Sequence, residues 1–332
     1  MSKRVGAVLT RPFVDEAAAA SLLRERWHIE ARLRPLPSER DRNFAVEIDR
    51  RPVFVLKVSN VADDLVLLQM QHAALSVLAA AGVPCQRPME TIDGDEILTW
   101  TPIDGQPVLV RLLTWLPGRP LADVPPTDRP PALLEDLGAT MGRTANALTR
   151  FDHPAVRRPF QWDARHGLDV IDAHASAVGD ATRVALIGRW RARLDRLATV
   201  LPALRASVIH NDANDHNVLV ADDGQAISGL LDPGDAVWSI TVNELAVAAA
   251  YAALDAPDPI RVIERVRVGF ERELPLTDEE RSLLVELVAL RLCTSVALSA
   301  HQSRLAPGDA YLTISEAPAF ALLERLERET AS

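Results

Sequence analysis

The segment HNDANDHN at residues 210–217 concentrates small polar side chains between two apolar stretches, SVI and VLV, that have the composition of β-strands. His210, Asp212 and Asn217 follow the pattern H-x-D-x-x-x-x-N, and Asp232 comes later in the sequence LLDPGD. An amide oxygen and a carboxylate suit Mg²⁺, so Asn217 and Asp232 are a candidate metal-binding pair. Asp212 follows a predicted strand and is placed to orient an attacking hydroxyl group and accept its proton, while His210 is expected to hold the loop backbone by hydrogen bonds. These residues in this order predict transfer of a phosphoryl group.

A lysine on another predicted strand can supply a cation for the phosphates of a nucleotide. Lys57 lies within the apolar stretch VFVLKVSN. Removing an ammonium group from water is unfavourable unless an anion accompanies it. A bound phosphate is such an anion, so we expect Lys57 to contact the nucleotide.

The elements that must position these residues fall into two unlike parts. Residues 1–116 contain a helical pattern at 14–26, three strand-like stretches within residues 28–58, a second helical pattern at 63–81 and two further strands near residues 95–115. A proline-rich segment after Pro117 separates them from long helical patterns. Those patterns lie at residues 131–150, 168–200, 241–254, 258–272, 278–302 and 316–329, with a β-loop-β-turn-β unit set among them at residues 207–235. We therefore expect an α+β protein with an antiparallel-sheet lobe at residues 1–116 and a mostly helical lobe at residues 117–332.

The composition narrows the classes of partner. The 332 residues carry 36 Lys and Arg against 46 Asp and Glu, a formal charge of −10, which disfavours nucleic acids and acidic membranes. Cys85 and Cys293 have neither disulfide nor metal-ligand spacing, which favours a reducing, cytoplasmic environment. We interpret the apolar stretch LLVELVALRLCTSVALSAH as a core helix, and no membrane span or signal sequence is predicted.

The order of the motifs resembles a known family of enzymes. The strand lysine, the helix after it, the connector LLTWLPGRPL, HNDANDHNVLV and GLLDPGD occur in the order found in protein-kinase-like small-molecule kinases. Over about residues 27–255 the sequence resembles the aminoglycoside phosphotransferase superfamily, and it is most similar to the hydroxylysine kinase and homoserine kinase type II branch. The resemblance implies a two-lobed protein-kinase-like fold in which Lys57 binds the α and β phosphates and the backbone at Trp115 and Leu116 contacts the purine.

Several positions depart from the family pattern. Where the superfamily often has a helix glutamate that pairs with the lysine, Gln71 stands here, and an amide holds Lys57 more weakly than a carboxylate does. Pro233 follows the metal-binding Asp232. The expected phosphate-covering turn, PSERDRNFAV, has no glycine, so Ser38 and Asn43 are candidates for phosphate contacts by analogy.

Acidic and aromatic residues near the motifs are candidates for binding the acceptor. Asp215, Asp235 and Glu244 are either surface acids and helix caps or groups that line the site and favour a cationic acceptor. Trp238 either packs in the core or provides a cation-π wall for a substrate amine.

The prediction is a kinase that uses Mg²⁺ and ATP, or alternatively GTP, and phosphorylates a small cationic amino alcohol, hydroxylated amino acid or aminoglycoside-like molecule. Gln71 and Pro233 motivate an alternative, a catalytically inactive nucleotide-binding regulatory module. The other alternative is a metal-dependent hydrolase, which leaves Lys57 without a role. Its two-metal centre would draw on His210, Asp212, Asp215, His216, Asp232 and Asp235. The sequence does not indicate an oligomeric state.

Overall fold

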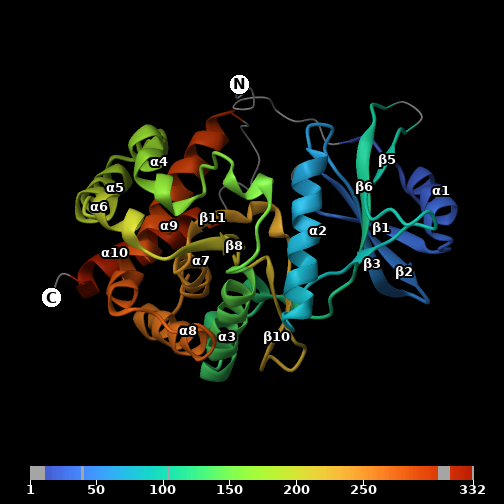
Figure 1. Ribbon diagram of the computed structural model, residues 1–332. Coiled ribbons are helices and arrows are strands. Elements are labelled where there is room, and N and C mark those ends of the chain that lie inside the picture. Colours follow the sequence, from blue (N-terminus) through green and yellow to red (C-terminus); the bar gives the residue numbers. More distant parts are fainter. Residues whose placement is uncertain (1–11, 39–40, 103–104, 306–314, 331–332) are drawn as a thin grey trace. The chain divides into compact units, whose positions relative to one another are not determined.

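The computed structural model describes residues 12–38, 41–102, 105–305 and 315–330, and the chain divides into two compact units (Figure 1). The sheet unit comprises the described residues up to Ala79 together with Cys85–Leu116. The helical unit comprises Ala80–Pro84 together with the described residues from Pro117 onward.

The sheet unit is built on antiparallel strands, as the alternating sequence pattern predicts. The strands are β1 (Arg32–Leu36), β2 (Arg42–Ile48), β3 (Arg51–Val58), β4 (Pro88–Met89), β5 (Leu98–Trp100) and β6 (Val108–Thr114). Their order is β1-β2-β3-β6-β4, and β5 also pairs with β6. Asp49 and Arg50 connect β2 to β3 with φ values of 50° and 65°, the left-handed conformation that a tight hairpin turn requires.

Two helices lie on opposite sides of this sheet (Figure 1). Helix α1 (Glu16–Trp27) begins at Asp15, whose carboxylate accepts a hydrogen bond from the Ala18 N–H at 2.7 Å. The apolar face of α1 packs against Leu56 and its neighbours on the sheet. Successive strand residues point to opposite faces, so Lys57 points away from this core, toward the side of α2 (Leu65–Ala80).

The helical unit confirms most of the predicted helices. They are α3 (Pro131–Leu148), α4 (Gly167–His174), α5 (Ala181–Leu194), α6 (Leu197–Val200), α7 (Asn243–Ala252), α8 (Pro259–Glu273), α9 (Asp278–Leu305) and α10 (Glu316–Thr330). The single helix predicted at residues 168–200 is wrong. Gly179 has a φ of 78°, which ends the first segment, and Asp180 then caps α5 by accepting from the Arg183 N–H at 2.9 Å.

Short strands flank the two polar motifs, the first being residues 210–217 and the second residues 230–235. The first motif connects β8 (Ala206–Ile209) to β9 (Val218–Val220), and the second connects β10 (Ile227–Leu230) to β11 (Val237–Ile240). Strand β8 pairs with β11, while β9 lies between β10 and β7 (Arg119–Pro120). The predicted β-loop-β-turn-β unit is confirmed, and β11 adds a strand that was not predicted.

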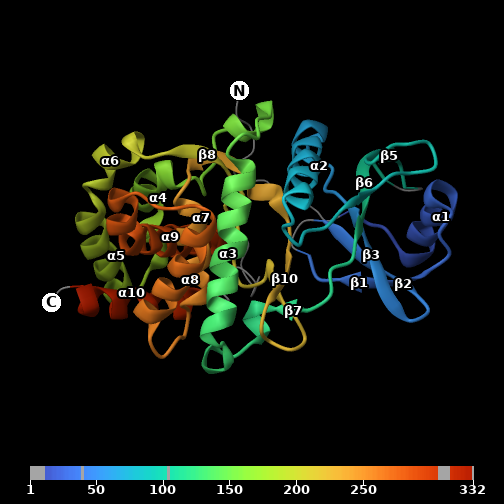
Figure 2. The ribbon, with the colours of Figure 1, turned by 60° about the horizontal axis from the view of Figure 1, so that its bottom comes forward.

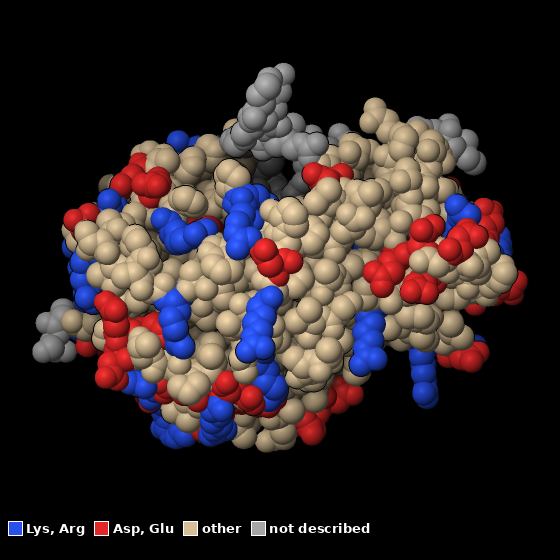
Figure 3. Space-filling view, in the orientation of Figure 1, with Lys and Arg blue, Asp and Glu red and all other residues tan. Residues whose placement is uncertain are grey.

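Helix α9 runs through the middle of the helical unit (Figure 2). By length and composition it is apolar enough to cross a membrane, with a mean hydropathy of 1.8 over its most apolar window, yet 78% of that window is buried inside the protein. It packs against α4, α7 and α10. This burial is typical of a core helix. On the surface shown in Figure 3, acidic and basic side chains of the described residues are mixed.

Candidate active site

His210 joins the two polar motifs. It is 1% exposed, its backbone N–H donates to the Glu244 carboxylate, and its ring Nε2 lies 3.0 Å from the Leu231 carbonyl oxygen. Its Nδ1 accepts from the Asp212 N–H at 3.3 Å, so Nε2 carries the proton and donates to Leu231. Burial lowers the pKa of His210 to about 4, against the opposing effect of Asp232, so the ring is neutral near pH 7. His210 therefore ties the start of one loop to the start of the other.

Both carboxylate oxygens of Asp212 are held by hydrogen-bond donors. The side-chain amide of Asn214 donates to Oδ1 at 2.9 Å, and the amide of Asn217 donates to Oδ2 at 2.7 Å. A guanidinium nitrogen of Arg291, on α9, lies 3.3 Å from Oδ1. These donors fix the orientation of the carboxylate, while the side chain remains 22% exposed and can meet a substrate.

The electrostatic environment of Asp212 makes it a stronger base than an ordinary carboxylate. Burial and the nearby Asp235 and Asp232 raise the pKa of Asp212 to about 8, while Arg291 and Asn214 oppose the rise. With this pKa the group holds a proton near pH 7 unless a cation neutralises the neighbouring carboxylates, and once ionised it is suited to accept a proton from a hydroxyl group.

The backbone of the loop turns at Asn211, which has a φ of 67°. Asparagine tolerates this left-handed conformation better than most residues. Its side-chain Nδ2 donates to the Trp162 carbonyl oxygen at 3.3 Å, and its Oδ1 accepts from the Asn243 amide at 3.1 Å. The turn is thus anchored from two sides.

The structure corrects the assignment of Glu244 to the acceptor site. Glu244 has no exposed surface, and its carboxylate accepts hydrogen bonds from the backbone N–H groups of His210 and Asn211. Burial raises its pKa to about 7. Glu244 lies beneath the loop and holds its backbone, so it does not line a surface that an acceptor reaches.

Asn217 and Asp232 have oxygens suited to a hard metal ion. The amide nitrogen of Asn217 is used on Asp212, so its oxygen is the atom that can act as a ligand. Asp232 has a φ of 53° and accepts from the Gly234 N–H at 3.2 Å, and Pro233 takes the first position of the short 3₁₀ helix that follows. Pro233 is therefore accommodated without loss of a backbone hydrogen bond.

The two residues fit Mg²⁺ that is shared with a nucleotide. No group of three or more His, Cys, Asp or Glu side chains within the described ranges is arranged to hold a metal ion by itself. Two oxygen ligands that leave the remaining positions to phosphate and water are typical of nucleotide-bound Mg²⁺. The six-residue centre of the hydrolase alternative is not assembled among the described residues.

The two other acidic acceptor candidates, Asp235 and Asp215, have different surroundings. The Asp235 charge acts on Asp212 and Arg291, which puts it near the base. The charges that stabilise the Asp215 carboxylate are those of His216 and Arg129. The backbone oxygen of Asp215 accepts a hydrogen bond from the Ala122 N–H at 2.9 Å.

Trp238 already has a cation on its ring. The guanidinium carbon of Arg157 lies 4.6 Å from the centroid of the indole. The proposed cation-π wall for a substrate amine is corrected accordingly, because this contact is made by the protein's own arginine.

In the sheet unit, polar residues form a row across three strands. Asn43, Lys57 and Arg111 are neighbours in the register of β2, β3 and β6, and Lys57 and Arg111 are 8% and 4% exposed. The Gln71 amide oxygen accepts from Arg111 at 2.6 Å, and its expected pairing with Lys57 stays a prediction. Burial, Arg111 and Lys57 together lower the pKa of His72 on α2 to about 3, so this face of the sheet is cationic.

The other predicted nucleotide contacts are only partly available. The Trp115 N–H donates to the Val53 carbonyl at 2.8 Å, so it is not offered to a purine, which leaves its carbonyl group and the backbone of Leu116. The Ser38 hydroxyl oxygen accepts from the Asp41 N–H at 3.3 Å. Residues 39–40 of the expected phosphate-covering turn lie outside the described residues.

Arg291 is a residue of this site that the sequence did not suggest, as are Asn211 and Asn214 in the loop itself. It is 5% exposed and lies 4.5 Å from the Trp162 ring centroid and 5.6 Å from that of Tyr251. Burial opposes its charge, but Tyr251, Asp212 and Asp235 raise its pKa above the ordinary value. A single arginine within the apolar stretch LLVELVALRLCTSVALSAH was the available signal.

Comparisons with known proteins decide the family. The sequence profile of the phosphotransferase enzyme family matches residues 32–283. The chain belongs to this family. It is 31% identical to hydroxylysine kinase of Bos taurus, covering 96% of this chain and 90% of that protein, and 29% identical to hydroxylysine kinase of Danio rerio, covering 96% and 92%.

Solved structures of other phosphotransferases share the fold. A microcompartment-associated aminopropanol kinase has a TM-score of 0.73 at 19% identity and covers 95% of this chain and 98% of that one. Amicoumacin kinase has a TM-score of 0.69 at 16% identity, with coverage of 95% and 93%. The predicted protein-kinase-like fold is confirmed, and this phosphotransferase is a small-molecule kinase that acts on a hydroxyl group.

Proposed function

We propose that this phosphotransferase transfers the γ-phosphoryl group of ATP, with Mg²⁺, to the side-chain hydroxyl of a small hydroxylated amino acid of the hydroxylysine type. Four hydroxylysine kinases are 29–31% identical to this chain and match 95–96% of its length. Amicoumacin kinase, which shares the fold, was solved with AMP-PNP, an ATP analogue. The observation that carries the proposal is the Asp212 carboxylate, held by donors on both oxygens while its side chain stays partly exposed.

The residues divide the reaction between them. The acceptor hydroxyl gives its proton to Asp212 as its oxygen forms a bond to the γ phosphorus, and the bond from that phosphorus to the β–γ bridging oxygen breaks, which releases ADP. Asn214 and Asn217 keep the carboxylate oriented during this step. Asn217 and Asp232 would hold Mg²⁺, which neutralises charge on the phosphate oxygens. Lys57 is assigned to the phosphates of the nucleotide.

The charge near the base favours an acceptor that carries an amine. Asp212, Asp232 and Asp235 influence one another electrostatically, so their surroundings are rich in negative charge. An ammonium group on the acceptor is stabilised by such surroundings. We expect Asp235→Asn to raise the KM of the acceptor more than the KM of the nucleotide, and equal effects would remove Asp235 from the acceptor site.

A screen of nucleotide consumption tests the proposal. The protein is incubated with Mg²⁺ and either ATP or GTP, against a panel that contains hydroxylysine, homoserine, aminopropanol, ethanolamine, choline and an aminoglycoside. We expect the highest kcat/KM with hydroxylysine and ATP, and no transfer after chelation of the metal. The Asp212→Ala variant serves as the background control. Turnover on an aminoglycoside or amino alcohol alone would contradict the assigned acceptor.

A further inference from the structure

Arg291 is held in an unusual way for a buried charge. Its guanidinium carbon lies 4.5 Å from the Trp162 ring centroid and 5.6 Å from that of Tyr251, and one nitrogen lies 3.3 Å from Oδ1 of Asp212. The Nε and Nη1 atoms are buried and have no hydrogen-bond partner among the described residues. The side chain contacts the carboxylate of Asp212, which is the candidate base, and it also interacts with the Tyr251 side chain.

Stability does not explain an arginine at this position. Burying a guanidinium and leaving two of its nitrogens without acceptors are both unfavourable, and the charge is tolerated because Tyr251, Asp212 and Asp235 favour it. Leucine or methionine would fill the space beside these rings on a core helix with no such penalty. An arginine here needs a role that a neutral side chain cannot perform.

The charges around Asp212 indicate that role. The carboxylates of Asp232 and Asp235 repel its negative charge, whereas Asn214 and Asn217 contribute neutral amide donors. Among the contacts of the described residues, Arg291 brings a full positive charge to Asp212 from a rigid helix. The Trp162 and Tyr251 side chains pack close to the guanidinium and restrict its position beside Asp212.

We propose that Arg291 is a positioning residue that acts through Asp212, holding the carboxylate in the orientation in which it receives the proton of the acceptor. This inference rests on the proposed function, in which Asp212 is the base. It assigns a part in catalysis to α9, a helix whose sequence predicts only packing.

A double-mutant cycle separates positioning from packing. Arg291→Met keeps an apolar side chain beside the two rings and removes the charge. We expect it to lower kcat about 100-fold in the wild-type background, with little change in the KM of the nucleotide. In an Asp212→Ala background the same substitution should lower the residual rate less than about 3-fold, because the group through which Arg291 acts is gone. Equal losses in both backgrounds would overturn the proposal.

Chemical rescue gives an independent readout. In Arg291→Ala, added guanidinium ion at low millimolar concentration should restore at least about 10-fold in kcat, whereas urea, which is similar in shape but uncharged, should not. Arg291→Lys should retain more activity than Arg291→Met because it keeps a positive charge. Equal recovery with guanidinium and urea would show that Arg291 only fills space.

Arg183→Ala is the matched control. The Arg183 guanidinium lies 4.6 Å from the Phe320 ring centroid and 2.9 Å from a Glu316 oxygen, so it combines an aromatic and a carboxylate contact as Arg291 does, but between α5 and α10. Its loss should lower the melting temperature without changing kcat. A fall in kcat as large as that of Arg291→Met would contradict a specific role for Arg291.

For each variant of the double-mutant cycle, two rates are measured: phosphoryl transfer to the acceptor and hydrolysis of the nucleotide by water. In hydrolysis the same base accepts a proton from the water. If no acceptor of the panel is phosphorylated but hydrolysis shows the predicted coupling of Arg291 and Asp212, the acceptor assignment fails and the role of Arg291 stands. If the acceptor is phosphorylated and the coupling is absent, the reverse holds.

Discussion

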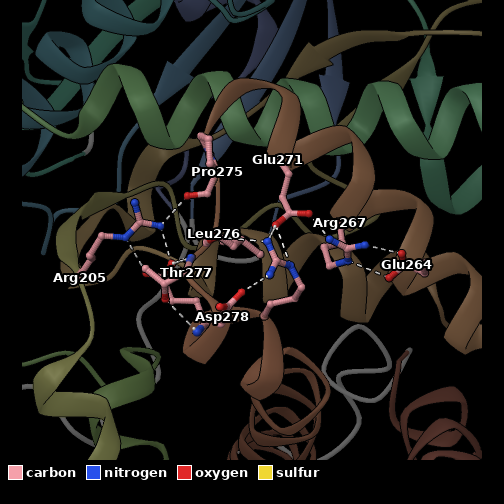
Figure 4. A network of polar contacts seen from close by, with 10 residues as sticks. Arg205, Glu264, Arg267, Glu271, Pro275, Leu276, Thr277 and Asp278 are labelled. Atoms are coloured by element: carbon pink, nitrogen blue, oxygen red, sulfur yellow. Dashed lines mark hydrogen bonds and ion pairs between the residues drawn. The ribbon is translucent and has the colours of Figure 1, made fainter.

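Two polar regions of the helical unit are built on opposite principles. At the corner between α8 and α9, Arg205 donates to both oxygens of Glu280 and to the Pro275 carbonyl (Figure 4). Thr277 and Glu280 form a capping box in which each backbone N–H donates to the other side chain, at 2.9 and 3.1 Å. Donors and acceptors match here, and Glu280 is held although it is 1% exposed.

The loop at residues 210–217 leaves its charges less fully matched. Asp212 is repelled by two other carboxylates, two nitrogens of Arg291 have no acceptor among the described residues, and Asn211 adopts a left-handed backbone. The corner therefore stabilises the fold, whereas the loop retains unfavourable charge and backbone geometry of the kind found at functional sites. Substitutions at the corner should affect unfolding, and substitutions in the loop should affect activity.

The largest effect after that of the base is expected at Asp232. Asp232→Asn removes a negative charge from the metal pair and should weaken binding of the Mg²⁺-nucleotide complex about 10- to 100-fold. The free energy of unfolding should change little or even rise, because the substitution also relieves repulsion of Asp212. Calorimetric titration with Mg²⁺ and a non-hydrolysable ATP analogue measures the affinity, and an unchanged value would remove Asp232 from the metal site.

Glu280→Gln tests the other side of the comparison. The substitution removes the carboxylate that pairs with Arg205 and receives the Thr277 N–H, and should lower the free energy of unfolding by about 1–3 kcal/mol, since Arg205 is half-exposed and can be resolvated. Denaturant unfolding measures the loss. kcat should be unchanged, and a large fall in kcat with little loss of stability would break the division between corner and loop.

A smaller effect is expected on the pH dependence of the free energy of unfolding below pH 7, to which His210 contributes. Burial lowers the pKa of His210 to about 4. Below about pH 6.5, His210 therefore binds a proton in the unfolded chain but not in the folded protein. The stabilising contribution of neutral His210 is present above pH 6.5 and is lost as the pH falls toward 4. His210→Gln should make the free energy of unfolding less dependent on pH within this window, and unfolding curves collected from pH 7 to pH 4.5 measure the difference. An unaltered slope would contradict the neutral, buried imidazole.

Local sequence patterns predicted much of the fold. Alternation in residues 42–58 predicts the β2–β3 hairpin, and the proline-rich segment after Pro117 lies where the two units meet in the sequence. The spacing of His210, Asp212 and Asn217 predicts one polar loop because all three lie on a single short connection. The break at Gly179 was missed, because a glycine within an otherwise helical pattern is often tolerated.

Partners from distant segments could not be predicted in the same way. Gln71 meets Arg111, Glu244 meets the backbone of His210, and Arg291 meets Asp212, and each pair is 34 or more residues apart in sequence. Propensity and periodicity concern neighbours along the chain, whereas these contacts depend on how strands and helices pack. A charged residue in an apolar helical stretch, as at Arg291, is the kind of local inconsistency that marks such a site.

The central claim is that Asp212 is the base of a hydroxyl-directed kinase. Its most direct test is the rate of a single turnover, with enzyme in excess over labelled ATP and saturating hydroxylysine, for the wild type and for Asp212→Asn. The isosteric amide keeps the shape of the side chain but cannot accept the proton. We predict a rate at least about 1000-fold lower with unchanged affinity for the nucleotide. A single-turnover rate for Asp212→Asn equal to that of the wild type would contradict the account.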